Sequence, residues 1–150
     1  MNSQPSLVNF MMIDDDDDHA KLVARNLGKD RIGNSFIHFS DGIEALKYLR
    51  KQGEHADARL PDVILLDLKL PGMGGHEILS AIKADEHLAG IPVVILTTSN
   101  AEVDRCKAYN LHANSYLVKP VDLKSFQQMA RDLGLYWGMW NQPGACRKST

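Results

Sequence analysis

The chain of 150 residues is poor in several features that mark broad classes of protein. It has two cysteines, Cys106 and Cys146, which are too few for a disulfide scaffold and are expected to stay reduced. No apolar run is long enough to span a bilayer, and the start, MNSQPSLVNF, lacks the basic region and apolar core of a signal peptide. The formal net charge of −2 argues against electrostatic binding to nucleic acid. We therefore expect a cytoplasmic protein that binds neither membranes nor nucleic acids.

The sequence also lacks both common nucleotide-binding loops, G-x-x-x-x-G-K-[ST] and G-x-G-x-x-G, so a nucleoside triphosphate is not expected as a substrate. Its six histidines are scattered without metal-ligand spacing. What is present is an ordinary globular composition, with 44% hydrophobic and 24% charged residues, and a length that suits one core. We expect a single domain over residues 1–140 with an extended last helix, followed by a flexible tail at 141–150.

Short apolar runs alternate with amphipathic stretches along the whole chain. The pattern predicts strands at 7–13, 35–39, 62–67, 91–99 and 115–120, and helices at 21–27, 41–53, 76–84, 101–111 and 123–140. Continuous apolar strands separated by helices indicate a parallel sheet covered on both faces. We therefore expect an α/β protein with a doubly wound, flavodoxin-like sheet of five strands in the order 2-1-3-4-5, flanked by five helices in three layers.

Helical spacing also predicts which side chains of the helices face the core. The predicted core residues are Ala20, Val23, Ala24 and Leu27 in the first helix, Ile43, Leu46 and Leu49 in the second, and Leu123, Phe126, Ala130, Leu133 and Trp137 in the last. Asp41 and Asp122 stand where helix caps are expected.

Polar side chains follow four of the predicted strands at the point where each strand ends. Asp14 and Asp15 follow the first strand, whereas Asp67 lies at the end of the third, Thr97 with Thr98 at the end of the fourth and Lys119 at the end of the fifth. In a parallel sheet these ends meet at one edge, where doubly wound proteins place their sites. Three neighbouring carboxylates repel one another unless a cation joins them, and oxygen ligands of this kind suit Mg²⁺.

This set of side chains can carry phosphoryl transfer. A carboxylate can attack a phosphoryl group and become an acyl phosphate. A lysine and a hydroxyl group can then hold the phosphoryl oxygens.

The sequence resembles the receiver domain of two-component response regulators over residues 7–133. The resemblance rests on MMIDDD, VILLDLKLPGMGG, PVVILTTS and SYLVKP in that order. It implies that Asp67 accepts a phosphoryl group from a histidine kinase. It also implies that Asp14, Asp15, Asp67 and the backbone carbonyl of Lys69 bind Mg²⁺.

The same resemblance assigns further roles at the end of the sheet. Thr97 and Lys119 match the hydroxyl and the lysine that contact the phosphoryl group, and Tyr116 matches the aromatic residue whose rotamer follows the movement of the hydroxyl. The peptide bond before Pro120 is usually cis in this family. The resemblance implies a phosphoacceptor signalling protein, which catalyses only its own phosphorylation and dephosphorylation and is not otherwise an enzyme. We expect a stand-alone regulator, because no room remains after residue 140 for an output domain.

Residues 97–126 and the ending LYWGMWNQPG are similar to the small regulators that partner phytochrome-type histidine kinases. That subfamily is commonly dimeric. The resemblance therefore implies a homodimer formed by the fourth helix (101–111), the fifth strand, the last helix and the C-terminal extension with Trp137 and Trp140. The alternative for these aromatic residues is that they fold back on the domain.

Other interpretations stay open. The five aspartates at 14–18 could be a solvated patch, and one of Asp16, Asp17 and Asp18 is expected to cap the first helix. A register shift of one residue would make Asp15 and Asp16 the acidic pair. An aspartate-nucleophile phosphohydrolase usually has a second acid two residues after the nucleophile, where this chain has Lys69. A constitutive interaction module with a vestigial site is the third possibility.

Overall fold

The protein was analysed in a computed structural model, which describes residues 8–27 and 34–140. The predicted start of the first strand at Leu7, the predicted tail at 141–150 and Cys146 lie outside the described residues. The elements are β1 (Asn9–Ile13), α1 (Asp17–Asn26), β2 (Ser35–Phe39), α3 (Gly42–Leu49), the short 3₁₀ turn η1 (Gly53–His55), β3 (Val63–Leu66), α4 (Gly75–Ala84), β4 (Val93–Thr97), α5 (Glu102–Asn110), β5 (Ser115–Val118), α6 (Leu123–Leu135) and the π-helical segment η2 (Tyr136–Trp140).

The five strands form one parallel sheet in the order β2-β1-β3-β4-β5, which confirms the predicted fold. The register aligns the strand ends: Ile13, the last residue of β1, pairs with Phe39 and Leu66, the last residues of β2 and β3. On the other side, Thr97 at the end of β4 pairs with Val118 at the end of β5. The residues that follow these strands therefore share one edge of the sheet.

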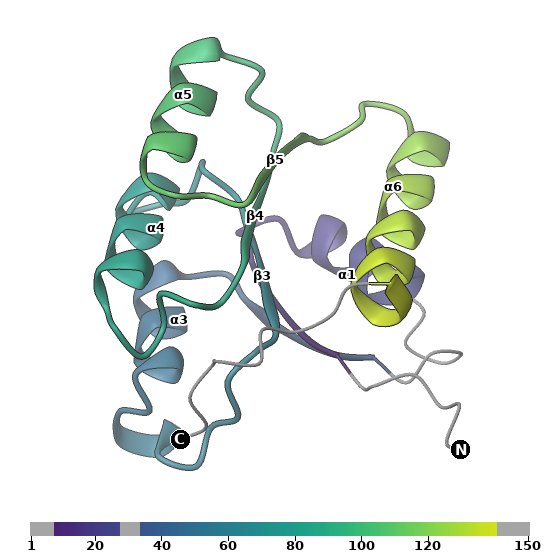
Figure 1. Ribbon diagram of the computed structural model, residues 1–150. Coiled ribbons are helices and arrows are strands. Elements are labelled where there is room, and N and C mark those ends of the chain that lie inside the picture. The colour runs from purple at the N-terminus through teal and green to yellow at the C-terminus, as the bar shows by residue number, and fades with distance from the viewer. Residues whose placement is uncertain (1–7, 28–33, 141–150) are drawn as a thin grey trace.

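The central strands β1, β3 and β4 are largely apolar because helices cover both faces of the sheet, whereas the edge strands β2 and β5 are less buried and include His38 and Ser115. In β1, Met11 and Ile13 face α3, α4 and α5, whereas Phe10 and Met12 face α1 and α6. Figure 1 shows these two helical layers on either side of the sheet, with α3, α4 and α5 on the left and α1 and α6 on the right. Alternate residues of each central strand thus enter different cores.

Three aspartates begin helices by accepting backbone N–H groups that have no partner inside the helix. Asp16 accepts from His19 N at the start of α1, Asp41 from Ile43 N at α3, and Asp122 from Ser125 N at α6. These contacts confirm the predicted caps at 41 and 122 and identify Asp16 as the member of the acidic run that caps the first helix.

Two of the predicted core residues are exposed. Ile43 is 51% exposed and Leu123 is 57% exposed, so both assignments were wrong. In α3 the buried residues are Gly42, Ala45, Leu46 and Leu49, and Ile43 lies about 100° around the helix from Gly42, beside this stripe. In α6 the buried stripe begins at Phe126, so the first turn with Leu123 extends past the packed part of the layer. Ala24 is half-buried.

The predicted last helix divides into two parts, because α6 ends at Leu135 and the next five residues form the wider turn of η2. Gly134 and Gly138 occur at this junction, and glycine is a poor helix former. Trp137 folds back and packs, half-buried, against the core beneath α1 and α6. Leu135, Tyr136 and Met139 are exposed, and the side chain of Trp140 lies outside the described residues.

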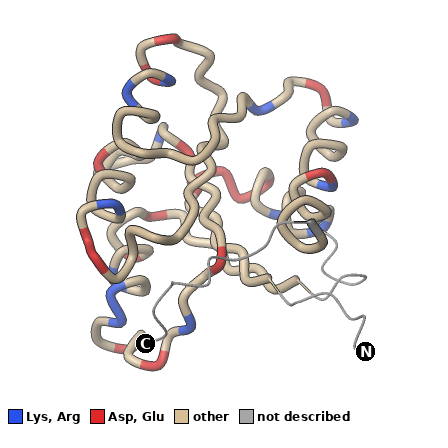
Figure 2. The backbone as a smooth tube through the Cα atoms, in the orientation of Figure 1, with Lys and Arg blue, Asp and Glu red and all other residues tan. Residues whose placement is uncertain are grey.

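Acidic and basic residues are interspersed along the described backbone, with a continuous acidic segment leading into α1 (Figure 2). Cys106 is an exposed free thiol on α5. Among the described residues, no helix has both the length and the apolar character needed to span a membrane.

Gly134 allows α6 to lie directly against the end of α1. A Cβ atom at this position would lie 2.3 Å from the carbonyl oxygen of Leu27 and 2.6 Å from its carbonyl carbon. We predict that Gly134→Ala lowers the free energy of unfolding by about 1–3 kcal/mol, although alanine has the higher helix propensity, because backbone must move to make room.

Chemical denaturation of both proteins measures this difference. Gly90→Ala is the matched control, since nothing lies within 4 Å of a Cβ atom there. We expect that control to stay within about 0.5 kcal/mol of the parent protein. A Gly134→Ala variant as stable as the control would contradict the close approach of α6 to Leu27.

Candidate phosphoryl-acceptor site

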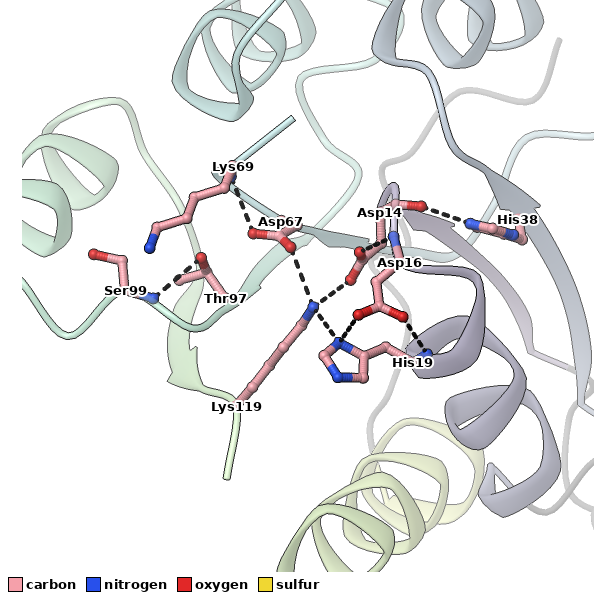
Figure 3. A network of polar contacts seen from close by, with 9 residues as sticks. All are labelled: Asp14, Asp16, His19, His38, Asp67, Lys69, Thr97, Ser99 and Lys119. Atoms are coloured by element: carbon pink, nitrogen blue, oxygen red, sulfur yellow. Dashed lines mark hydrogen bonds and ion pairs between the residues drawn. The ribbon is translucent and has the colours of Figure 1, made fainter. Parts of the chain in front are cut away.

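The carboxyl edge of the sheet brings together Asp14, Asp15, Asp67 and Lys119. Ligand atoms of the three carboxylates lie within 4.8 Å of one another. The Nζ atom of Lys119 lies 2.6 Å from Oδ2 of Asp14 and 3.1 Å from Oδ2 of Asp67 (Figure 3). Asp14 is 0%, Asp67 6% and Lys119 5% exposed, whereas Asp15 is exposed. Water therefore reaches the group mainly from the side of Asp15.

Asp14 is fixed by backbone contacts on both sides. Its N–H donates to the carbonyl of Phe39 at 3.0 Å, its Oδ1 accepts the N–H of Asp16 at 2.8 Å, and Nε2 of His38 lies 2.7 Å from its carbonyl oxygen. Burial raises the pKa of the Asp14 carboxyl group, and the hydrogen bond from Lys119 only partly offsets this. The buried surroundings of Asp14 therefore disfavour the ionised form of its carboxyl group.

Asp67 continues the sheet beyond β3, since its N–H donates to the carbonyl of Ile13 at 3.0 Å. Its Oδ1 accepts the N–H of Lys69 at 3.0 Å, and its Oδ2 accepts from Lys119. Both oxygens therefore have partners, and both partners donate hydrogen bonds to a carboxylate. The role predicted for the carbonyl group of Lys69 stays a prediction.

Lys119 reaches the acids from the end of β5, where its N–H donates to the carbonyl of Thr97 at 2.7 Å. The peptide bond before Pro120 is trans, as are all peptide bonds of the described residues, so the expectation of a cis bond was wrong. The two isomers of an X–Pro bond differ by only about 0.5–1 kcal/mol, which local context easily outweighs. The lysine contacts both carboxylates with the bond trans.

The register of the acidic run follows from the positions of its members. Asp14 and Asp15 lie with Asp67, whereas Asp16 caps α1 and its pKa is lowered, first of all by the N–H of His19. Asp17 and Asp18 form the exposed first turn of the helix. The alternative pair of Asp15 and Asp16 is therefore not the one that faces Asp67.

The segment from Thr97, the last residue of β4, to Ser99 lies beside Asp67 (Figure 3). Thr97 is fully buried, and its Oγ1 accepts the N–H of Ser99 at 3.4 Å. Tyr116, which is half-buried, donates its hydroxyl hydrogen to the carbonyl of Ser99 at 3.0 Å. Ser99 also bonds through its Oγ to the carboxylate of Asp104, and Thr98 is exposed. The segment thus links the end of β4 to β5 and α5, and the switch roles of Thr97 and Tyr116 stay predictions.

The sequence analysis missed His19. Its Nδ1 lies 2.9 Å from Nζ of Lys119, a residue 100 positions away in the chain. A signal was available, because His19 falls in the first turn of α1, three residues after the cap and at the same edge as Asp14. Metal-ligand spacing among histidines does not reveal a single histidine that lies beside a lysine in the fold.

A family model of the response regulator receiver domain matches residues 10–131. The chain belongs to this family. It is therefore a receiver domain, a signalling module of two-component systems, and its family membership confirms the resemblance inferred from the motifs.

Two curated relatives match this receiver domain over most of their length. FilR2 of Methanothrix harundinacea, a probable methanogenesis regulatory protein, is 40% identical over 136 residues, which covers 90% of this chain and 87% of FilR2. The response regulator Rcp1 of Synechocystis is 38% identical over 128 residues, which covers 85% of this chain and 87% of Rcp1.

Solved structures agree with these relatives. The phosphorylated cyanobacterial phytochrome response regulator RcpA superposes with a TM-score of 0.89 at 34% identity, covering 93% of this chain and 100% of RcpA. The Mn²⁺-bound form of Rcp1 superposes with a TM-score of 0.87 at 36% identity, covering 92% of this chain and 99% of Rcp1. The receiver domain is thus similar to phytochrome-associated regulators across nearly its whole length.

The raised pKa of Asp14 predicts a pH-dependent stability. Between the ordinary value of 3.8 and the raised value, the folded protein binds more protons than the unfolded chain, so stability falls as the pH rises through this interval. Asp14→Asn removes this cost. Without metal at pH 7, we expect the variant to have the higher melting temperature, because the buried charge is removed while the asparagine oxygen can still accept from Lys119.

Thermal melts over a range of pH measure this effect. The difference between the two proteins should narrow as the pH is lowered through the interval, because Asp14 then becomes neutral in the parent protein as well. Asp57→Asn, at an exposed loop position, is the control and should shift neither the melting temperature nor its pH dependence. A difference that stays constant with pH would contradict the assignment to Asp14.

Proposed function

We propose that this receiver domain accepts one phosphoryl group on Asp67 in a Mg²⁺-dependent reaction and signals through changed protein contacts. The observation that carries the proposal is the buried contact of Lys119 Nζ with Oδ2 of Asp67, at 3.1 Å, beside two further carboxylates. An ammonium group in this position can stay in place while the carboxylate oxygen gains a phosphoryl group. It then contacts the oxygens of the new acyl phosphate.

The reaction is an in-line displacement at phosphorus. A carboxylate oxygen of Asp67 attacks the phosphorus of a phosphohistidine, the P–N bond breaks, and the leaving imidazole nitrogen keeps the electron pair and takes up a proton from water. Lys119 and the hydroxyl group of Thr97 bind oxygens of the transferred group. Hydrolysis reverses the state of the protein: water attacks phosphorus, the P–O bond to Asp67 breaks, and carboxylate and inorganic phosphate are released.

The residues present fit a divalent cation. Asp14, Asp15 and Asp67 carry three formal negative charges and Lys119 one positive charge, which leaves −2 at a site of hard oxygen ligands. Burial raises the pKa of Asp14, and a cation beside its carboxylate would favour the ionised form. These three carboxylates, with the carbonyl group of Lys69, would hold Mg²⁺, which when bound supplies charge neutralisation at the phosphoryl oxygens.

A phosphohydrolase is the less suitable function for this site. Such an enzyme needs a general acid to protonate its leaving group, and the second residue after Asp67 is Lys69, whose N–H donates to the nucleophilic carboxylate. Phosphohistidine needs no such acid from the protein, because imidazole is a good leaving group. The geometry therefore favours a phosphoacceptor.

We predict that acetyl phosphate with Mg²⁺ adds one phosphoryl group to the full chain, detected as intact mass and as base-labile phosphate. Asp67→Asn should abolish the gain, and chelation of Mg²⁺ should slow it strongly. Asp15→Asn should weaken Mg²⁺ binding, whereas Asp17→Asn, an exposed acid of the same run, is the matched control and should not.

Three outcomes would contradict the proposal in different ways. Absence of phosphorylation, with a histidine kinase also tried, would indicate a vestigial interaction module. Continuous turnover of varied phosphate esters would indicate a phosphohydrolase. Equal phosphorylation of Asp67→Asn would place the acceptor elsewhere.

The phosphodonor that we propose is a histidine kinase of the phytochrome type. This rests on the similarity to Rcp1 and to RcpA, of which RcpA is described as a phytochrome response regulator. The similarity covers 93% of this chain and 100% of RcpA.

We also propose a homodimer formed through α5, β5, α6 and η2. Most of the exposed large apolar residues of the described chain lie on or beside these elements: Val103 and Tyr109 on α5, Val118 at the end of β5, Val121 in the turn before α6, Leu123 at its start, and Leu135, Tyr136 and Met139 near the C-terminal end. Apolar exposure of this extent favours a protein contact. Because Trp137 is packed against the domain core, its neighbours supply more of the contact surface than Trp137 does.

Leu123→Asp tests this surface. The change puts a charge into an apolar contact, and an acidic residue in the first turn of a helix is compatible with folding. We expect the dissociation constant of the dimer, measured by analytical ultracentrifugation, to rise by about tenfold or more. Ile43→Asp is a matched control, because Ile43 is an equally exposed apolar residue in the first turn of α3. Monomeric parent protein at all concentrations, phosphorylated or not, would rule out the dimer.

A further inference from the structure

One nitrogen of His19 lies between a positive and a negative group. Its Nδ1 atom is 2.9 Å from Nζ of Lys119 and 3.2 Å from Oδ2 of Asp16 (Figure 3). A ring nitrogen carries either a lone pair or a hydrogen, so it cannot serve both partners at once. With the lone pair it accepts a hydrogen bond from Lys119, and with the hydrogen it donates to Asp16.

The position of the ring is fixed from two sides. The N–H of His19 donates to Oδ1 of Asp16 at 3.0 Å, which holds the residue at the start of α1. The ring stacks on Phe126 of α6 with a centroid distance of 5.0 Å and an interplanar angle of 32°. These two contacts therefore hold the imidazole in the orientation in which it meets Lys119.

Lys119 uses all its hydrogen-bonding capacity in this arrangement. An ammonium group has three N–H donors, and its three partners are Oδ2 of Asp14, Oδ2 of Asp67 and Nδ1 of His19. The lysine side chain is 2% exposed, so water is a poor substitute for a lost partner. Removing His19 would leave one N–H without an acceptor and free the ammonium group to turn away from Asp67.

We propose that His19 is a positioning residue for Lys119 and thereby for the contact of Lys119 with the phosphoryl group. This inference rests on the function proposed above. Neutral His19 accepts from Lys119 and directs its remaining N–H groups at the acids. Protonated His19 donates to Asp16 instead and places a second positive charge beside the ammonium group, which drives the lysine from its position. Phosphoryl transfer is then slower.

Among the described residues, two charged groups contact the His19 ring, Asp16 at the start of α1 and Lys119 after β5. The contact from α6 is the uncharged Phe126. The expected dependence on pH thus arises from a competition between two named partners.

Two variants of the full chain separate positioning from space filling. His19→Asn keeps an acceptor near the place of Nδ1 but does not titrate, and His19→Leu keeps the bulk against Phe126 without an acceptor. Initial rates of phosphorylation by acetyl phosphate at saturating Mg²⁺ should be similar for the parent and His19→Asn at pH 8. His19→Leu should be about tenfold slower, the effect of a lost hydrogen bond to a charged group.

On acidification to pH 6, the parent rate should fall relative to that of His19→Asn. Effects on the carboxylates and on the phosphodonor are common to both proteins and cancel in the ratio. A ratio that does not change with pH, or equal losses in the two variants, would overturn the proposal.

A second measurement needs no phosphodonor. Nitrogen-15 chemical shifts of the imidazole report which ring nitrogen carries the hydrogen. At pH 8 we expect Nδ1 of the parent protein to be unprotonated, and Lys119→Met to move the hydrogen to Nδ1, because Asp16 is then its remaining partner. A hydrogen on Nδ1 in the parent protein overturns the proposal, even if the Lys119 variant does not fold. If no form of the protein is phosphorylated, the proposed function fails while the imidazole spectrum still decides the role of His19.

Discussion

The buried ammonium group of Lys119 connects residues that follow three strands of the sheet. It lies 2.6 Å from a carboxylate that follows β1 and 3.1 Å from one that follows β3, and its own backbone continues β5. Without this cation, two buried carboxylates would face each other across a few ångströms. Breaking a buried ion pair by removing one partner typically costs about 3–5 kcal/mol, because the remaining charge stays buried without compensation. The same contact therefore serves the stability of the edge and the chemistry expected there.

The site is nevertheless incomplete in charge. Lys119 balances one of three carboxylates, and the pKa of Asp14 is raised by burial despite the hydrogen bond from the lysine. Further basic residues at this site would balance the remaining carboxylate charge, but they would also remove the attraction for the cation proposed above. Functional sites commonly keep such unfavourable interactions, and the cost is carried by the well-packed cores on the two faces of the sheet.

The fold could be predicted because its signals are redundant. Five apolar runs alternate with five amphipathic stretches, and the residue types at the run ends already indicate one edge with acids, hydroxyl groups and a lysine. Asp14, Asp15, Asp67 and Lys119 were placed together by topology alone. Their side-chain geometry could not be predicted in this way, because a strand end fixes where a residue lies and not which atoms it contacts.

The errors have identifiable physical causes. Leu123 fits the helical period but lies in a first turn, and the period does not show where the neighbouring layer ends. Ile43 lies beside the buried stripe of α3, which starts from the small residue Gly42. His19 lies in a helix and Lys119 after a strand about 100 residues later, so no local pattern connects them. The isomer of the bond before Pro120 depends on a small energy difference that family habit does not determine.

The acidic run that leads into α1 has a further consequence for how its length can vary. Because the five residues at 14–18 are identical, deletion of any one gives the same product, with four aspartates between Ile13 and the histidine. If the strand-end pair and the cap kept their places, every later residue of α1 would rotate by about 100°, which would take Val23 out of the core. If the helix kept its face, one aspartate would have to serve both as a strand-end acid and as the helix cap. A shorter run would still be a run of aspartates, but the number of residues between the end of β1 and the start of α1 is fixed by the positions of these two elements.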